Sequence, residues 1–371
     1  MNVLVIFGGK STEHDISIIT ALQLAQNYNG CKNNLIPLYI NNGFYIGEKL
    51  NDIDTFINKD FKSLKRVLFV QNGICDFKKP KKIKGIDCAI LCAHGGDGEN
   101  GALAGMMEMY NIPYTSCDVL ASSIGMSKDA SKKYFKAIGL NVLPNIVLEK
   151  ERYFDDYVNL RKDIVKKMKF PLIIKPNSAG SSIGIKVVKD FNEFEEAMEV
   201  AFLYDEFVTI ERALTNFYEI NCAAIKVGDD IKISQTEHPA SWQDFLTYEE
   251  KYISAPKHQI PADISAEMAT EVSKLTEKIY KEMNLFGVVR MDFMWDRDAS
   301  KLYINEINTI PGSMAYYLFE GVGIMYNELI EIMIEQAVAR KAKQTKICYN
   351  YNTSVLQLNK KKSLVGGKQK A

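Results

Sequence analysis

The chain of 371 residues lacks a charge imbalance, because 46 lysines and arginines are matched by 46 aspartates and glutamates. Without a net charge there is no overall field to attract nucleic acid or an anionic membrane, so recognition must come from local clusters. The chain also lacks a hydrophobic run long enough to span a membrane. Its start has an apolar run of only five residues and no cationic leader, which indicates a first strand rather than a signal peptide. We therefore expect a cytoplasmic protein without nucleic-acid or membrane partners.

A disulfide framework is also absent. Seven cysteines are an odd number, and they are scattered through apolar contexts, which is typical of reduced cytoplasmic thiols. Cys88, Cys92 and His94 come nearest to a thiolate metal site. No second cysteine pair accompanies them, so we interpret the two cysteines as small core residues of a buried strand.

Short β-rich runs alternate with helix-period segments over most of the length, which predicts an α/β chain. With 47% hydrophobic residues, the chain can form two or three compact units. The first part resembles a small doubly wound unit, in which ligands bind beyond the carboxyl ends of the strands. Two glycine-containing segments fall at such ends, residues 8–14 and residues 94–101.

Three oxygen-bearing side chains lie in two strand-like runs of the C-terminal half. Glu306 and Asn308 are two positions apart, so on a strand both project to one face. Asp292 interrupts an earlier apolar run, and antiparallel pairing of the two runs could place its carboxylate beside them. Mg²⁺ favours a few such oxygens and completes its coordination with nucleotide phosphates. The cluster predicts a magnesium site for phosphoryl chemistry, and the alternative is that Asp292 and Glu306 are solvated charges at strand edges.

Phosphate binding has one good candidate segment. The start of the chain is not a P-loop, because the glycine required five positions before Gly9 is Leu4. In residues 175–184, small residues leave several backbone amides able to converge on an anion, and Lys175 supplies a positive charge. The alternative is a plain β-hairpin loop, although such a loop does not require a lysine at the end of its strand.

Read in order, these segments resemble the ATP-grasp superfamily, and more closely the D-alanine-D-alanine ligases. The matches span about residues 1–338 and lie in residues 8–14, 94–101, 175–184, 248–252, 290–292 and 305–312. The resemblance implies an N-terminal α/β substrate-binding domain (1–126), a small ATP-grasp subdomain (127–210) and a large ATP-grasp subdomain with the Mg²⁺ and substrate site (211–340). A basic tail (341–371) follows. ATP would lie between two antiparallel sheets.

The same resemblance implies roles for individual residues. The nucleotide phosphates would contact Lys128, Lys175 and, when a loop closes as a lid, Lys251. Glu211 and Leu214 match the adenine-binding hinge, and Glu219 matches the ribose-binding glutamate, although the stretch before it is one residue longer than usual. The metal ligands would be Asp292, Glu306 and Asn308. The substrate and its reacting carboxylate would meet Glu13, Ser181, Tyr252, Arg290 and Gly312.

The implied activity is an ATP- and Mg²⁺-dependent ligase, with Mn²⁺ as an alternative metal. It would join two D-alanines through an acyl phosphate to give D-alanyl-D-alanine for peptidoglycan precursors, in the cytoplasm and with a homodimer as one possible assembly. Tyr317 stands where the family has a serine for the second D-alanine's carboxylate. Three interpretations stay open there: the tyrosine hydroxyl serves instead, Ser313 substitutes, or the ring reshapes the pocket for another amine. Two alternative functions are a related ligase with a different acceptor and a non-catalytic ATP-binding regulator.

Overall fold

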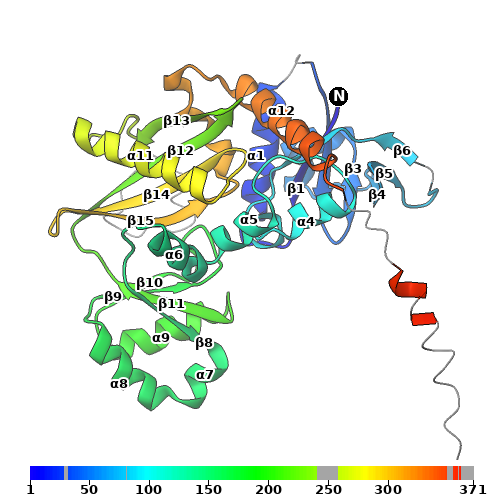
Figure 1. Ribbon diagram of the computed structural model, residues 1–371. Helices are drawn as coiled ribbons and strands as arrows, with labels where there is room; N and C mark the ends of the chain where they lie inside the picture. The colour runs from blue at the N-terminus through cyan, green and yellow to red at the C-terminus, as the bar shows by residue number, and fades with distance from the viewer. Residues whose placement is uncertain (29–31, 81, 240–257, 349–353, 358, 361–371) are drawn as a thin grey trace, which may run out of the picture. The chain divides into compact units, whose positions relative to one another are not determined.

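Strands and helices alternate along the described part of the chain, which confirms the predicted α/β class. The computed structural model, drawn in Figure 1, describes residues 1–28, 32–80, 82–239, 258–348, 354–357 and 359–360. The chain divides into two compact units, Met1–Val338 and Ala339–Ala371, and every site discussed below lies in the first. The helices of the described residues are too short or too polar to cross a bilayer.

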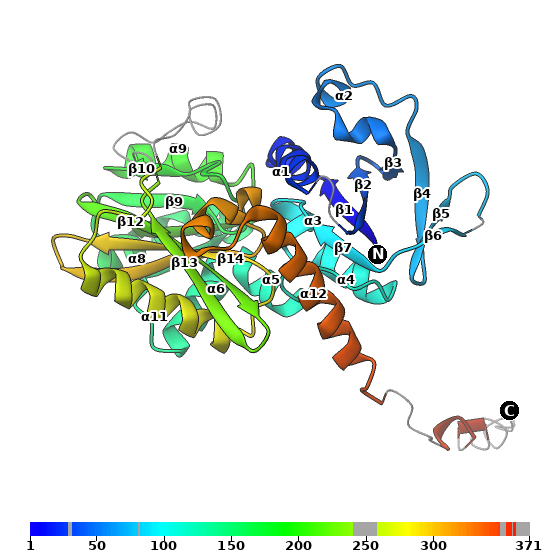
Figure 2. The same ribbon diagram turned by 90° about the horizontal axis from the view of Figure 1, so that it is seen from above.

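The first sheet has the strand order β6-β5-β4-β3-β2-β1-β7. Its strands are β1 (Asn2–Gly8), β2 (Asn34–Ile40), β3 (Phe44–Ile46), β4 (Lys65–Val70), β5 (Gly73–Asp76), β6 (Lys82–Gly85) and β7 (Cys88–Leu91). β1 pairs in parallel with β2 and β7, and residues 3–7 are at most 3% exposed, as expected for a continuous apolar run covered on both faces. Figure 2 shows α1 (His14–Asn27) beside β1.

A glycine turn connects β1 to α1. Gly8 has φ +88°, and a Cβ there would lie 2.6 Å from the Ile40 carbonyl oxygen of the neighbouring strand. Only glycine combines this left-handed conformation with such a close approach. The turn therefore delivers the residues before α1 to the carboxyl end of the sheet, where a doubly wound unit binds its ligand.

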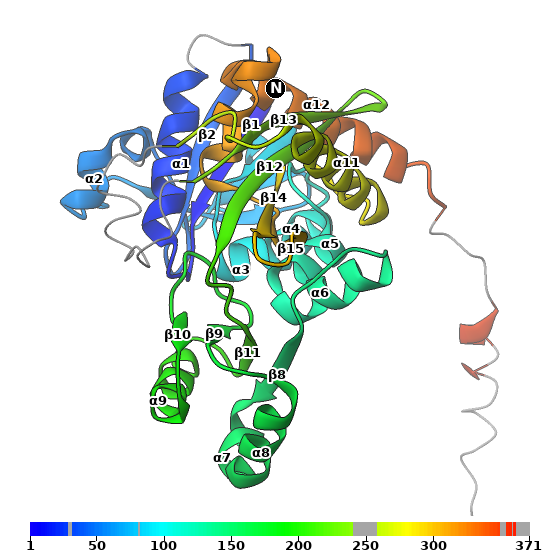
Figure 3. The same ribbon diagram turned by 90° about the vertical axis from the view of Figure 1, so that its left-hand side faces the viewer.

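The second sheet has the order β10-β9-β11-β8, and its pairs are antiparallel. Its strands are β8 (Asn145–Glu149), β9 (Leu172–Pro176), β10 (Lys186–Val188) and β11 (Phe207–Arg212). Figure 3 shows its three helices gathered beside it, namely α7 (Lys150–Asp155), α8 (Tyr157–Lys167) and α9 (Phe191–Ala201). β9 and β10 pair as an antiparallel hairpin around residues 177–185.

The third sheet has the order β13-β12-β14-β15, again antiparallel. Its strands are β12 (Phe217–Val227), β13 (Asp230–Glu237), β14 (Val289–Asp296) and β15 (Lys301–Asn308). The 17-residue α11 (Ala266–Glu282) packs on β12 and β13 through buried residues such as Val272 and Ile279. The other face of this sheet carries the charged residues of the site.

The remaining helices are mostly short, and the last of them has 19 residues. They are α2 (Ile53–Ile57), α3 (Gly96–Glu99), α4 (Ala102–Met109), α5 (Val119–Met126), α6 (Lys128–Ala137), the 3-10 helices η1 (Glu48–Asn51), η2 (Gly312–Leu318) and η3 (Glu320–Val322), and α12 (Tyr326–Gln344). α6 begins behind an N-cap, because the Ser127 hydroxyl accepts a hydrogen bond from the Ala130 amide. That cap fixes Lys128 as the first helical residue.

Candidate active site

The predicted site residues surround one pocket of about 930 Å³, which is lined by strands of the second and third sheets, by α1 and the loops that follow β1 and β7, and by η2. Twelve of the fourteen predicted residues line it: Glu13, Lys128, Lys175, Ser181, Glu211, Leu214, Glu219, Arg290, Asp292, Glu306, Asn308 and Gly312. Lys251 and Tyr252 lie outside the described residues. Segments that are far apart in the sequence thus converge on one cavity, as the sequence predicted.

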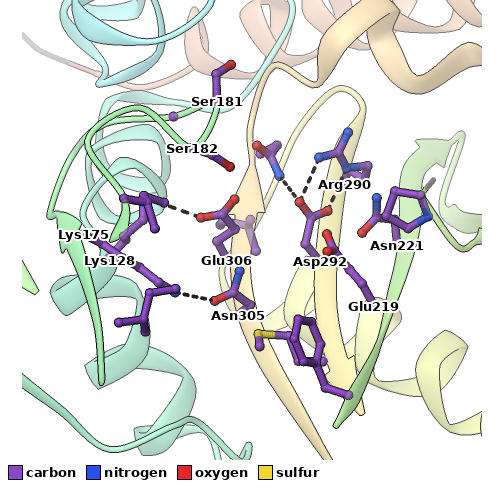
Figure 4. A pocket seen from close by; sticks show the side chains of 18 of the residues that line it. Lys128, Lys175, Ser181, Ser182, Glu219, Asn221, Arg290, Asp292, Asn305 and Glu306 are labelled. Atoms are coloured by element: carbon purple, nitrogen blue, oxygen red, sulfur yellow. Dashed lines mark hydrogen bonds and ion pairs between the residues drawn. The ribbon is translucent and has the colours of Figure 1, made fainter. Parts of the chain in front are cut away.

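The acidic cluster lies on the paired strands β14 and β15. Asp292 is opposite Glu306 and Arg290 is opposite Asn308, which is the antiparallel pairing that the sequence predicted. The Arg290 guanidinium donates to both oxygens of Asp292, from Nε at 2.7 Å and from Nη2 at 2.8 Å, and Asn308 donates to Asp292 at 2.9 Å. Figure 4 shows Arg290, Asp292 and Glu306 facing the pocket. Burial raises the pKa of Asp292, the Arg290 charge opposes this, and the Glu306 carboxylate adds to the rise.

A β-bulge sets the direction of two neighbouring side chains on β15. The register shifts after Asp292, so that Asn305 has no partner residue on β14 while Glu306 and Ile304 do. An extra residue of this kind redirects side chains that would otherwise alternate between faces. Both Asn305 and Glu306 consequently line the pocket, where the sequence analysis identified only Glu306.

The donor set suits a hard divalent cation. Two carboxylates, Asp292 and Glu306, and the amide of Asn308 are gathered on one wall, and Mg²⁺ takes oxygen ligands of this kind. The described residues contain no group of three or more His, Cys, Asp or Glu that could hold a metal. A cation here would therefore rely on two carboxylates, the amide and oxygens from a substrate, which is the usual arrangement for Mg²⁺ that binds together with a nucleotide.

Lysines form the opposite wall of the pocket. The Lys128 ammonium donates to the Ala179 carbonyl at 2.7 Å and lies 3.5 Å from Glu306. The Lys175 ammonium lies 3.1 Å from Glu211 and 3.3 Å from the Asn305 side-chain oxygen. Figure 4 shows both lysines facing β15. Each ammonium has three donors, so these contacts orient it without using all of its capacity.

A third lysine, Lys132, was missed by the sequence analysis. Its ammonium lies 2.8 Å from the second oxygen of Glu211, and the two side chains are only 2% and 0% exposed. Burial would raise the pKa of Glu211, but the charges of Lys132 and Lys175 outweigh it and lower that pKa to about 2. Because Lys132 lies one helical turn after Lys128, on the buried face of α6, only its spacing could have indicated the contact.

The substrate side of the pocket is centred on Glu13. Its carboxylate accepts a hydrogen bond from the Ser181 hydroxyl, which confirms that these two predicted residues lie together. Two glycines make room for it, since a Cβ at Gly180 would lie 2.5 Å and one at Gly95 2.6 Å from a Glu13 oxygen. The glycine-rich segments thus bring backbone close to this carboxylate.

Glu99 and His94 connect this side to the loop before η2. Glu99 accepts from the Ile310 amide at 3.1 Å and the Gly95 amide at 3.2 Å, and burial and the Glu13 charge raise its pKa to about 7. His94 contacts the Ile310 carbonyl at 2.8 Å and the Thr20 hydroxyl at 2.8 Å. Burial lowers the His94 pKa to about 4, so this imidazole is neutral at physiological pH.

The backbone of η2 contains a left-handed turn. Ser313, Met314 and Ala315 have φ of +51°, +55° and +46°, a conformation that costs about 1–2 kcal/mol for each non-glycine residue. Two bonds to α1 hold the turn: the Ser313 amide donates to Thr20 at 3.2 Å, and the Ser313 hydroxyl donates to Gln23 at 2.5 Å. A Cβ at Gly312 would meet no atom within 4 Å, so this backbone faces open pocket space.

Tyr317 lies at the far end of η2, against a buried carboxylate. Its hydroxyl is 3.4 Å from Glu237, whose side chain is 1% exposed and is also bonded by Asn221 at 3.1 Å and by His258. Burial raises the Tyr317 pKa, so the phenol keeps its proton and donates it to Glu237. The hydroxyls of Tyr317 and Ser313 thus both have acceptors within the protein, and the three interpretations of this position stay open.

Known proteins are similar to this chain in sequence and in fold. Two family models match the chain, "D-ala D-ala ligase N-terminus" over residues 2–117 and "D-ala D-ala ligase C-terminus" over residues 134–335. The D-alanine--D-alanine ligase of Thermosipho africanus is 34% identical, and the match covers 98% of this chain and all of that protein. The D-alanine--D-alanine ligase of Caldicellulosiruptor bescii is also 34% identical, over 94% of this chain and 98% of its own length.

Solved structures of ligases with related names are similar to this chain in fold. The D-alanine-D-alanine ligase from Helicobacter pylori superposes with a TM-score of 0.75 at 30% identity, over 91% of this chain and 98% of that one. The VanG D-Ala:D-Ser ligase from Enterococcus faecalis has a TM-score of 0.77 at 29% identity, over 91% and 99%. These neighbours confirm the ATP-grasp fold that the resemblance implied. The chain belongs to the D-alanine-D-alanine ligase family.

Proposed function

We propose that the protein is an ATP- and Mg²⁺-dependent ligase that joins D-alanine to a second D-alanine through an acyl phosphate, supplying peptidoglycan precursors. Family membership supports the ligase activity. The observation that carries the mechanism is the facing arrangement of two lysines and two carboxylates in one pocket, since phosphoryl transfer depends on positioning and on offsetting charge. A cytoplasmic location and a homodimer remain predictions.

The donor half of the reaction follows from the pocket walls. Glu13, held by Ser181, would bind the ammonium group of the donor amino acid. Lys128 and Lys175 would bind the nucleotide phosphates, next to the Glu211 and Leu214 hinge for adenine and the Glu219 carboxylate for ribose. Asp292, Glu306 and Asn308 would hold Mg²⁺, which supplies positive charge to the phosphoryl oxygens.

Two further groups would face the reacting carboxylate. The donor carboxylate oxygen forms a bond to the γ-phosphorus of ATP, and ADP leaves with the pair of electrons of the broken bond. Arg290 and the Gly312 amide would bind the oxygen on which charge develops when the acceptor amine attacks. The open space over Gly312 supports this assignment.

The structure constrains the identity of the acceptor amine less than that of the donor. Tyr317 replaces the family serine and its hydroxyl is bonded to Glu237, which favours a related ligase with a different acceptor as the second candidate. One structural neighbour is a D-Ala:D-Ser ligase, so the fold accommodates another acceptor.

Phosphate release with D-alanine, ATP and Mg²⁺, followed by mass spectrometry of the product, tests the proposal. We expect phosphate release and D-alanyl-D-alanine. Phosphate release that needs another amine beside D-alanine would establish the second candidate. No phosphate release across a panel of D-amino acids would reject the substrate class.

A further inference from the structure

Dipeptide formation requires a proton acceptor near the incoming amine. An α-amino group is largely protonated at neutral pH and becomes a nucleophile only after it loses a proton. If the proposed function holds, the acyl phosphate waits near Arg290 and Gly312, so the base must lie on a wall of the pocket that the acceptor can reach. Glu13 is assigned to the donor's ammonium group and is not available for this task.

The chain has four histidines, and two of them are committed through both ring nitrogens. His14 bonds the Gly9 carbonyl at 2.7 Å and the Tyr39 hydroxyl at 2.9 Å. His94 bonds the Ile310 carbonyl and the Thr20 hydroxyl, as described above. A third, His238, donates through Nδ1 to the Glu219 carbonyl and stacks on the Tyr218 ring with centroids 3.8 Å apart. Within the described part of the chain, none of these three is paired with a carboxylate.

His258 is paired with a carboxylate. Its Nδ1 contacts the Glu237 carboxylate, which can only accept, so Nδ1 carries the proton and Nε2 of the neutral ring carries a lone pair. The ring lines the pocket, lies 5.5 Å from the Tyr317 ring between centroids, and its side chain is 38% exposed. This arrangement is that of a base oriented by a buried acid.

We propose that His258, oriented by Glu237, accepts the proton that the acceptor's ammonium group loses before the amine attacks the acyl phosphate. The freed nitrogen lone pair forms the C–N bond to the acyl carbon, and the C–O bond to phosphate breaks with its electrons going to phosphate. The second proton lost by the nitrogen leaves with the phosphate.

The surroundings of the pair support this role. Burial alone would raise the Glu237 pKa, but the hydrogen bond from His258 and the nearby Arg290 charge outweigh burial and lower it. The other groups that face Glu237 are Asn221 on β12, Tyr317 on η2 and, at longer range, Asp292 on β14. An ionised Glu237 is thus present to stabilise the imidazolium that forms.

Hydroxylamine separates this role from a structural one. It is an unprotonated nucleophile at neutral pH, so it traps the acyl phosphate as a hydroxamate without a base. We expect His258→Gln to lower kcat/KM for dipeptide formation about a hundredfold while hydroxamate formation stays within threefold of the wild type. Glu237→Gln should lower dipeptide formation about tenfold. Glu277→Gln, on the exposed surface of α11, is the matched control and should change neither reaction.

The pH profile gives a second measurement. In the wild type the dipeptide rate should rise with pH, because only the unprotonated dyad can take the proton, and His258→Gln should move that rise toward the higher pH at which the acceptor loses its own proton. Equal loss of both reactions in His258→Gln, or an unchanged dipeptide rate, would overturn the inference. Failure of the wild type to form either product from D-alanine and ATP would instead reject the proposed function.

Discussion

The two ends of the pocket hold a buried carboxylate in different ways. At the nucleotide end, Glu211 is bonded by two lysines. At the acceptor end, Glu237 is bonded by an imidazole, an amide and a phenol. The first arrangement gathers ammonium groups where a polyphosphate is expected, and the second holds a proton-accepting imidazole where we propose that a proton moves. Variants at the two ends should therefore respond differently.

The largest effect should come from the nucleotide end, because hydroxamate and dipeptide formation both require phosphoryl transfer from ATP there. We expect Lys175→Met to lower kcat/KM about a thousandfold for both hydroxamate and dipeptide formation, because it removes a cation from the transferring phosphoryl group. Lys281→Met, exposed on α11, is the control. A variant that lost only the dipeptide reaction would show that Lys175 acts at the acceptor end.

The second test removes a buried ion pair at the nucleotide end, through a lysine to which no substrate contact is assigned. Lys132→Met leaves one oxygen of Glu211 without its partner, and we expect a loss of about 2–3 kcal/mol in the free energy of unfolding measured with urea. The neighbouring Lys133→Met removes a 75% exposed ammonium paired with Asp129, and should cost less than about 1 kcal/mol. Equal losses in the two variants would contradict the buried pair.

The third test concerns the donor position between the two ends. Gly180→Ala would place a Cβ 2.5 Å from a Glu13 oxygen, so the carboxylate must move. Because a misplacement of about 1 Å can cost about a hundredfold in rate, we expect that loss in kcat/KM for D-alanine as donor. Gly105→Ala, whose Cβ would meet Val119 at an ordinary 3.5 Å, should change little. Wild-type activity in Gly180→Ala would separate Glu13 from donor binding.

The smallest effect concerns a third carboxylate, Glu99, whose donors are uncharged. Its pKa of about 7 in the folded protein exceeds the ordinary value of 4.5, so the folded state binds the proton more tightly. Stability from this group is complete below pH 4.5 and is lost as the pH rises through 7. Glu99 is half-buried, so we expect Glu99→Gln to gain only about 1–2 kcal/mol relative to the wild type between pH 5 and 8. A difference that is constant with pH would contradict the raised pKa.

Much of the fold and of the site could be predicted from local sequence. The pairing of Asp292 with Glu306 follows from apolar runs interrupted by charge, and the Lys175 loop follows from small residues after a strand. These signals are local, because strand periodicity and glycine content are properties of short segments. The resemblance then added residues such as Glu13 and Ser181, which no local pattern connects.

The residues that were missed depend on tertiary structure. Asn305 reaches the pocket because of a bulge, and Lys132 because α6 packs against Glu211. Glu237 and His258 meet through pairing at the end of β13, where the His238 and Gln259 amides and carbonyls bond one another. The helical spacing of Lys132 after Lys128 is the one local signal among these contacts, since each contact joins elements that come together only when the sheets form.

The left-handed turn at Ser313 to Ala315 has a consequence for how the enzyme is assembled. A backbone in this region costs a few kcal/mol in total, and it persists only while surrounding contacts enforce it. Those contacts come from Thr20 and Gln23, almost three hundred residues earlier in the chain. A chain whose first helix is unfolded or displaced would let the turn relax and carry the Gly312 amide away from the reacting carboxylate. The activity of the enzyme therefore depends on the correct folding of its first helix, at the other end of the chain.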